Sequence, residues 1–283
     1  MSLVIVPALK RTAAIAVLAV LPTACSLLPL RRTAETPAGR AFTTSVSLHG
    51  KPLELHVSRP RTPAAPGMAV LYASGDGGWF GAAVDMFRRI ADAGYQVVGF
   101  SSRAFLKIER PRGAPLVTGA QLAAEYEDIT AEARIALGLD DRSRFVLSGW
   151  SRGAAFSVLV ASEPKEQHHL LGVIAIGLGE GEDLAITDDD DDSDEHPSKD
   201  TKHWPFDTYA RIAQVAPLPC AVIQATKDNY FPAASAHRRF GPDTLQRRFY
   251  TIDAKNHRFS GGKPAFDAAL LDAIRWIVSQ SVN

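Results

Sequence analysis

The chain has 283 residues, of which 46% are hydrophobic and 22% charged, so it is long enough for one large domain with its own core. This composition excludes a chain that is disordered throughout. Lysine and arginine together number 31, as do aspartate and glutamate. The balance excludes a global field that would attract nucleic acid or an anionic surface, so we expect no nucleic-acid partner.

The N-terminus has the residue order of an export signal. Lys10 and Arg11 precede an apolar run over residues 12–21, and small residues follow that run. The run is too short for a typical membrane-spanning helix, and a buried helix is the alternative. We expect residues 1–25 to be a signal peptide and residues 26–40 a tether, with the mature protein in the periplasm.

The two cysteines have different predicted roles. Cys25 follows Thr-Ala, as a lipidated cysteine does at a lipoprotein cleavage site, but Pro22 stands where Leu is usual. Membrane association through a lipid on Cys25 is therefore left open. Cys220 lies in a predicted buried strand, so we expect no disulfide framework.

Residues 41–283 have the pattern of an α/β domain. Polar and apolar residues roughly alternate over 42–58, which predicts an antiparallel hairpin at a sheet edge. Apolar strands then alternate with amphipathic helices, which predicts a mostly parallel sheet covered on both faces. The predicted strands are 68–74, 95–101, 144–148, 170–178, 220–226 and 247–252, and the predicted helices are 82–93, 118–137, 154–161 and 264–278.

One acidic segment does not fit a compact fold. Residues 188–192 are consecutive aspartates inside the polar stretch 187–203, which we expect to be a mobile solvated loop. A Ca²⁺ site or a lid over the active site is the alternative, but no spaced ligand pattern with a glycine turn accompanies the run. His196 and His203 add little to a metal site. We predict no metal ion.

The predicted strand 144–148 runs into Gly149-Trp150-Ser151-Arg152-Gly153 and then into a predicted helix. A strand-to-helix turn this sharp strains the serine backbone and needs small residues two positions before and after it. The turn presents the hydroxyl of Ser151 at a helix N-terminus, where backbone N–H groups can stabilise an oxyanion. We therefore predict Ser151 as a nucleophile, with the Arg152 amide in the oxyanion hole.

A serine nucleophile needs a base, and the base needs an orienting carboxylate. His257 follows the last predicted strand, and Asp228 follows the strand that ends at Thr226. The chain order Ser, Asp, His is that of the α/β-hydrolases, which is the fold class we predict.

Other residues compete for these two roles. Asp183, after the preceding strand, or Asp253, just before the histidine, could be the acid instead of Asp228. His168, His169 and His237 lie on predicted helices or surface turns, where an exposed structural role is the default.

A second motif, Ser74-Gly75-Asp76-Gly77-Gly78-Trp79, follows the first core strand. Its glycines allow backbone amides to approach a substrate closely. In hydrolases of this kind the loop at this position donates the other oxyanion N–H, here near Asp76 and Gly77. A tight turn with Asp76 as a helix cap is the alternative.

Taken together, these motifs and Val97-Val98-Gly99-Phe100 resemble the bacterial virulence protein VirJ family, including the hydrolase domain of AcvB. The resemblance runs from about Met68 to the C-terminus, and residues 182–186 and 218–223 agree with it. It implies a periplasmic serine hydrolase. AcvB-like members cleave the lysyl ester of lysyl-phosphatidylglycerol, and VirJ-like members are associated with type IV secretion.

The sequence departs from the family beside the predicted pocket. Arg152 stands where Phe is usual, and the aromatic cluster expected after the second core strand is reduced to residues 102–105. Both departures bear on the substrate rather than on the reaction.

The predicted function is ester hydrolysis without a metal or organic cofactor. We expect Trp79, Trp150, Glu182 and Asp183 to contact the substrate and Arg152 to approach a lipid phosphate. Asp76, Glu182 and Asp183 would together attract an ammonium group; the alternative is that Asp76 caps a helix and that Glu182 and Asp183 only begin the solvated acidic loop. A general carboxylesterase or lipase-like lipoprotein is one alternative. A non-catalytic periplasmic interaction protein, associated with virulence or secretion, is the other.

Overall fold

The computed structural model describes residues 34–36, 39–109, 117–184 and 204–280. All of them belong to the unit formed by residues 31–283. The predicted signal peptide and the predicted acidic loop, 187–203, lie outside the described residues. No helix in the described part of the chain is long and apolar enough to cross a membrane.

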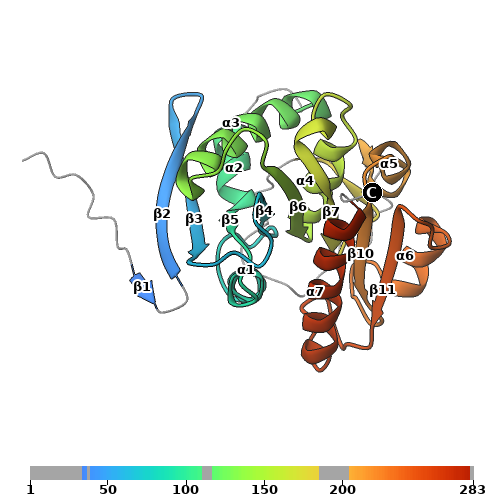
Figure 1. The fold of residues 1–283 in the computed structure, drawn as a ribbon. Helices are drawn as coiled ribbons and strands as arrows, with labels where there is room; N and C mark the ends of the chain where they lie inside the picture. The colour runs from blue at the N-terminus through green and yellow to red at the C-terminus, as the bar shows by residue number, and fades with distance from the viewer. Residues whose placement is uncertain (1–33, 37–38, 110–116, 185–203, 281–283) are drawn as a thin grey trace, which may run out of the picture. The chain divides into compact units, whose positions relative to one another are not determined.

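A nine-stranded sheet with the strand order β1-β2-β3-β5-β4-β6-β7-β10-β11 is the centre of the fold (Figure 1). Strands β5, β4, β6, β7, β10 and β11 are mutually parallel, and β1, β2 and β3 pair antiparallel with their neighbours. The strands are β1 (Ala34–Thr36), β2 (Gly39–Leu48), β3 (Lys51–Pro60), β4 (Met68–Ala73), β5 (Val97–Phe100), β6 (Arg144–Trp150), β7 (Leu170–Ile176), β10 (Cys220–Ala225) and β11 (Arg247–Ile252).

The chain reverses its direction of travel across the sheet at β4. It passes from β4 outward to β5 and then returns to the other side of β4 to form β6. The helices that follow β4 and β6 therefore lie on opposite faces of the sheet, and the carboxyl ends of these two adjacent strands are where α/β sheets of this kind bind ligands. Both predicted site motifs lie in the loops after these strands.

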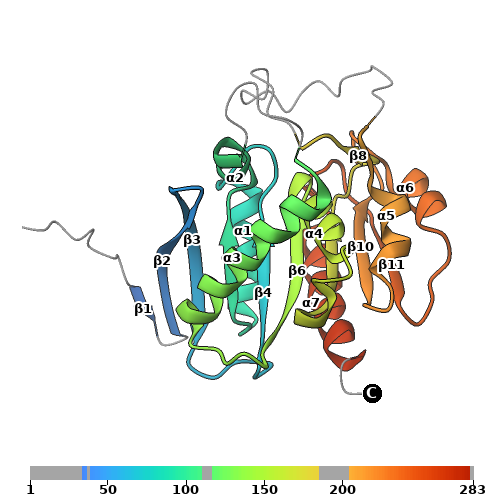
Figure 2. The ribbon, with the colours of Figure 1, turned by 90° about the horizontal axis from the view of Figure 1, so that it is seen from above.

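Helices cover both faces of the sheet (Figure 2). Side chains of α1 and α7 form one apolar core with one face of the strands, and side chains of α3, α4, α5 and α6 form another core with the opposite face. The α-helices are α1 (Ala82–Asp92), α2 (Ser102–Glu109), α3 (Gly119–Leu137), α4 (Arg152–Ala161), α5 (Thr208–Val215), α6 (Ala233–Phe240) and α7 (Lys263–Gln280).

The central strands are continuous apolar runs because both of their faces are covered. Every residue of β4, β5, β7 and β10 is buried, as is β6 after its first residue. Alternate residues point to opposite cores: Leu71 joins the α3–α4 side, and Val70 and Tyr72 join the α1–α7 side. The predicted α/β layering is confirmed.

Most predicted elements are confirmed to within a few residues. Helix α3 begins with a capping box between Thr118 and Gln121 and ends at Gly138, which has a left-handed conformation. The short helices α2, α5 and α6 were not predicted. Nor were the 3₁₀ turn η1 (Gln167–His169) and the two-stranded ribbon of β8 (Gly181–Glu182) with β9 (Phe206–Asp207).

The predicted tether is wrong at its C-terminal end. Strand β1, Ala34–Thr36, pairs with Gly39, Arg40 and Ala41 of β2 and forms the outermost strand on that side of the sheet. Edge pairing uses backbone groups alone, so a polar sequence without an apolar pattern can add a strand there. The predicted hairpin, β2 with β3, lies next to it.

Candidate active site

Ser151 sits in a strained turn between β6 and α4. Its φ and ψ are 57° and −119°, which place a non-glycine residue in a sparsely populated region. A Cβ added at Gly149 would overlap the carbonyl oxygen of Gly153, and one added at Gly153 would overlap that of Ala73. The turn therefore requires both glycines, as the motif predicts.

His257 lies beside this turn through the end of β7. The backbone N–H of Ser151 donates to the carbonyl oxygen of Ile176 at 2.8 Å. The next residue, Gly177, has a φ of 59°, and a Cβ there would come within 2.7 Å of Cε1 of His257. Glycine at this position thus lets the imidazole approach the turn that carries the nucleophile.

Asp228 and His257 form a buried pair. Nδ1 of His257 lies 2.7 Å from Oδ2 of Asp228, and the two residues are 7% and 1% exposed, respectively. Because a carboxylate can only accept, Nδ1 carries the proton and Nε2 is left with its lone pair. Nε2 is buried and has no hydrogen-bond partner among the described residues.

The carboxylate of Asp228 is held by other donors besides the histidine. Its Oδ1 accepts from the backbone N–H groups of Tyr230 at 2.9 Å and Phe231 at 3.2 Å. Its Oδ2 also accepts from Nε2 of Gln224 at 3.1 Å. These bonds compensate for the lost hydration of a buried charge and fix the carboxylate against the imidazole.

The residues that competed for these roles lie elsewhere. Asp183 is paired with Arg152, and Asp253 accepts from Oγ1 of Thr226 at 3.1 Å. His168 and His169 lie against each other in η1. His237, in α6, stacks on Phe249, in β11. Among these aspartates and histidines, Asp228 and His257 are the two that pair with each other.

Two aromatic residues hold the histidine loop. The indole N–H of Trp150 donates to the carbonyl oxygen of His257 at 3.2 Å, and their ring centroids are 5.3 Å apart. The ring of Tyr230 meets the imidazole edge-on at 4.9 Å. These contacts give Trp150 a positioning role, and its predicted substrate contact stays a prediction.

The loop after β4 lies directly against Ser151. A Cβ added at Gly75 would come within 3.2 Å of Cβ of Ser151, and the N–H of Gly78 donates to the carbonyl oxygen of Gly75 at 3.1 Å. The residue at the N-cap of α1 is Gly81, without a side-chain cap. The tight turn of the alternative interpretation is therefore present, but Asp76 does not cap a helix.

Asp76 instead belongs to a charged cluster around Arg152. Nε of Arg152 lies 2.6 Å from Oδ1 of Asp76 and 3.3 Å from Oε1 of Glu182, and Nη2 lies 3.7 Å from Oδ1 of Asp183. The guanidinium is thus surrounded by carboxylates of the protein. This arrangement weighs against the predicted approach of Arg152 to a lipid phosphate.

Glu182 is the most buried carboxylate of the cluster. Burial raises its pKa to about 7, and the negative charges of Asp76 and Asp183 act in the same direction, whereas Arg152 and the N–H of Leu184 act against it. Glu182 therefore changes its charge near neutral pH.

Trp79 anchors the loop from its far end. Its ring stacks on His56 with centroids 4.1 Å apart and meets the edges of Tyr72 and Phe87. Gly99 provides the room, because a Cβ there would overlap the indole. These are packing contacts, and the predicted role of Trp79 in substrate binding stays a prediction.

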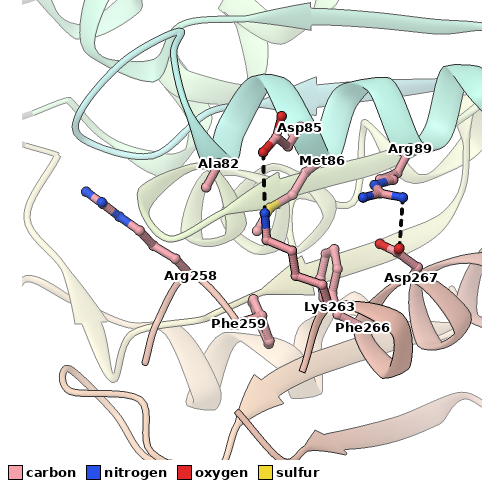
Figure 3. A pocket seen from close by; sticks show the side chains of 9 residues that line it. All are labelled: Ala82, Asp85, Met86, Arg89, Arg258, Phe259, Lys263, Phe266 and Asp267. Carbon is pink, nitrogen blue, oxygen red and sulfur yellow. Dashed lines mark ion pairs between the residues drawn. The ribbon is translucent and has the colours of Figure 1, made fainter. Parts of the chain in front are cut away.

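A separate shallow pocket lies between the N-terminal parts of α1 and α7 (Figure 3). Lys263 pairs with Asp85 across it at 3.6 Å, and Arg89 pairs with Asp267 at 2.9 Å. Ser151, Asp228 and His257 are not among the residues that line it. In the described part of the chain, no group of three or more His, Cys, Asp or Glu residues is arranged to hold a metal ion.

Solved structures of known hydrolases resemble this arrangement of strands and loops. An α/β serine hydrolase without a lid from Xanthomonas campestris matches with a TM-score of 0.54 and 15% identity, over 83% of this chain and 94% of that one. The chain has the α/β-hydrolase fold. Scans of protein-family models and of curated proteins find no match.

Two esterases share this fold with the chain. Naproxen esterase from Bacillus subtilis matches with a TM-score of 0.55 and 14% identity, over 84% of this chain and 91% of that one. The esterase domain of a Rhodothermus marinus protein matches with a TM-score of 0.54 and 16% identity, over 83% of this chain and 97% of that one. At these identities the likeness concerns the fold, so the function must be argued from the site.

Sequence reasoning missed several residues of the site. Gln224 is a polar residue inside the apolar run of β10, and that contrast was a usable signal for a buried hydrogen-bonding role. Gly177 follows β7 as one of several glycines in that segment, and nothing in the sequence distinguishes the one that adjoins His257.

Proposed function

We propose that the protein is a serine hydrolase that cleaves carboxylic esters. Oγ of Ser151 attacks the acyl carbonyl, and Nε2 of His257 takes its proton and passes it to the leaving alcohol. Asp228 orients the imidazole and stabilises the imidazolium that forms. Water then attacks the acyl-enzyme by the same route, with His257 as the base, and releases the acid and free Ser151.

The oxyanion is held at a helix N-terminus. The Arg152 amide, at the start of α4, and the amides of Asp76 and Gly77, in the adjoining loop, are the donors in this proposal. The contact between Gly75 and Ser151 supports it, because it brings this loop against the nucleophile. Donors fixed in advance need no reorganisation when charge develops on the carbonyl oxygen.

The single observation that carries the proposal is the state of His257 beside the Ser151 turn. Its Nδ1 is bonded to a buried carboxylate, and its buried Nε2 has no partner among the described residues. A fold kept only as a scaffold has no need for a buried charge that four donors must compensate. This weighs against the non-catalytic interaction protein.

Three exposed aromatic residues support an ester with a large apolar part. Phe80, Tyr230 and Trp204 are 53%, 47% and 38% exposed. Phe80 covers Gly77 of the oxyanion loop, Tyr230 contacts His257, and Trp204 packs on Gly181 beside the charged cluster. Aromatic rings that border a site on several sides suit a lipid better than a small polar ester.

The finer proposal is that the acyl group is cationic, as in the lysyl ester of lysyl-phosphatidylglycerol. Three carboxylates face one guanidinium in the cluster beside Ser151, so the cluster is net negative even while Glu182 holds its proton. A partly desolvated negative cluster attracts an ammonium group. The resemblance to VirJ and AcvB-like proteins supports the same substrate.

The cellular setting is also a proposal. The basic and apolar order of residues 10–21 supports export to the periplasm, and Cys25 supports a lipid anchor. Association with secretion-system proteins follows from the resemblance alone. Fractionation of cells that express wild type and Cys25→Ser tests the first two points, because loss of the anchor should move the protein from membranes to the soluble periplasmic fraction.

Lipid hydrolysis in vitro tests the substrate. The purified enzyme is incubated with micelles of lysyl-phosphatidylglycerol, alanyl-phosphatidylglycerol or a neutral diacylglycerol, with Ser151→Ala as the blank. We expect release of lysine to be fastest, and Asp183→Asn, which alters the charged cluster outside the loop after β4, to reduce it more than it reduces hydrolysis of the neutral lipid. Equal rates on all three lipids would favour a general carboxylesterase or lipase.

A further inference from the structure

The side chain of Arg152 joins three segments that are far apart in the sequence. Arg152 is the first residue of α4, Asp76 lies in the loop after β4, and Glu182 and Asp183 follow β7. Its Nε lies 2.6 Å from Asp76 and 3.3 Å from Glu182. The Arg152 side chain is only 11% exposed, so these ion pairs are partly shielded from water and salt.

The middle of the loop after β4 offers a single side chain through which it can be anchored to a neighbouring segment. At one end, the N–H of Ser102 donates to Oγ of Ser74 at 3.1 Å, and at the other end Trp79 is packed against aromatic residues. Between these ends the sequence is Gly75-Asp76-Gly77-Gly78, in which Asp76 has the one side chain beyond hydrogen. Glycines leave the backbone many conformations unless something fixes it.

Glu182 fixes the other end of the bridge. Its Oε1 accepts from the backbone N–H groups of Asp183 at 3.1 Å and Leu184 at 2.8 Å. The carboxyl group is therefore held in place by its own segment while it faces the guanidinium. A guanidinium suits this bridge because its planar fork can meet carboxylates on two sides at once.

We propose that Arg152 is a positioning residue that holds the oxyanion loop in its working conformation. The inference rests on the proposed function and deepens it. The amide of Arg152 and the amides of Asp76 and Gly77 would be the donors, and the Arg152–Asp76 ion pair sets the spacing between them. The guanidinium itself acts through the loop and contacts neither substrate nor reacting atoms.

The test compares Arg152→Met, Arg152→Lys and Asp76→Asn with wild type. Arg239→Met is the matched control, because Arg239 also bridges two carboxylates, Glu180 and Asp207, but on an exposed surface. Steady-state kinetics use a soluble p-nitrophenyl ester. Hydrogen–deuterium exchange is followed in peptides that contain residues 75–78, with α7 as the internal reference.

In Arg152→Met we expect kcat to fall about 10²-fold with KM changed less than about threefold, because donors that act in the transition state are displaced. Exchange over residues 75–78 should become at least about tenfold faster, while α7 and Arg239→Met stay like wild type. Arg152→Lys should recover part of kcat. Asp76→Asn should lower kcat in the same way. The double variant Arg152→Met with Asp76→Asn should lose little more kcat than Arg152→Met alone.

Exchange at residues 75–78 that matches wild type in both Arg152→Met and Asp76→Asn would overturn the inference. So would a loss of activity in KM alone. Asp76→Asn keeps the test decisive if Arg152→Met does not fold, because the Asp76 side chain is 46% exposed and asparagine has nearly the same shape. A wild-type protein that hydrolyses no ester would contradict the proposed function, and the exchange data would still decide whether Arg152 holds the loop.

Discussion

Replacing Glu182 with glutamine should stabilise the folded protein above pH 7. Burial raises the pKa of Glu182 to about 7 from its ordinary value of 4.5. Glutamine has nearly the same shape, and its Oε1 can accept the same N–H groups of Asp183 and Leu184. The substitution therefore removes a charge that is costly to bury and keeps the hydrogen bonds.

The sign and size of the effect follow from linkage. A carboxyl whose folded pKa is raised contributes stability that is fully present below pH 4.5 and is lost as the pH rises toward 7, because the unfolded chain releases the proton first. At pH 8, a pKa shift of this size lowers the free energy of unfolding of the wild type by roughly 3 kcal/mol, which Glu182→Gln should restore. For a chain of this length, that is a rise of about 5–10 °C in Tm.

Thermal unfolding of wild type and Glu182→Gln from pH 4.5 to 8.5 measures the effect. Glu180→Gln is the control, since Glu180 is two residues away, exposed and paired with Arg239. The two proteins should have nearly the same Tm at pH 4.5 and diverge up to pH 7 to 8. A Glu182→Gln variant that is less stable than wild type at pH 8 would refute the reasoning, because Glu182 would then be an ionised partner that Arg152 stabilises.

Three further substitutions test the site. Asp228→Asn should lower kcat about 10³- to 10⁴-fold in ester hydrolysis, because asparagine favours the wrong imidazole tautomer, and Asp253→Asn should stay close to wild type. Trp150→Phe should lower kcat/KM about tenfold in the same assay, since the bond that holds the His257 carbonyl is lost. Gly153→Ala should destabilise the protein by about 3 kcal/mol or more, because its Cβ would overlap the Ala73 carbonyl. Chemical unfolding measures this loss, and a soluble variant with wild-type stability would contradict the tight turn.

The sheet could be predicted from the sequence because its strands carry strong local signals. Each central strand is a short apolar run, and the chain between them is amphipathic or rich in turn residues, so the predicted strand 247–252 coincides with β11. The helices α2, α5 and α6 have eight residues each, which is too few turns for a clear period. β1 pairs through its backbone and has no side-chain pattern to detect.

The glycine-flanked turn at Ser151, the pairing of Asp228 with His257 and the gathering of Asp76, Glu182 and Asp183 were predictable for the same reason, whereas the place of the Arg152 side chain was not. Ser151 and His257 stand at fixed places relative to strands, so the topology brings them together. The contact of Arg152 with Asp76, Glu182 and Asp183 depends on how three loops bend after their strands, which local sequence does not encode. The sequence suggested a lipid phosphate for Arg152 because its ion pairs with these carboxylates could not be foreseen.

Labelling with a fluorophosphonate probe tests the central claim most directly, because the probe bonds covalently to a serine that a base has activated. Trypsin releases residues 145–152 as one peptide, which contains both Ser148 and Ser151. Fragmentation should place the adduct on Ser151, and Ser151→Ala and Asp228→Asn should lose the labelling at equal probe and time. A wild-type protein that stays unlabelled, or one labelled on another serine, would contradict the account.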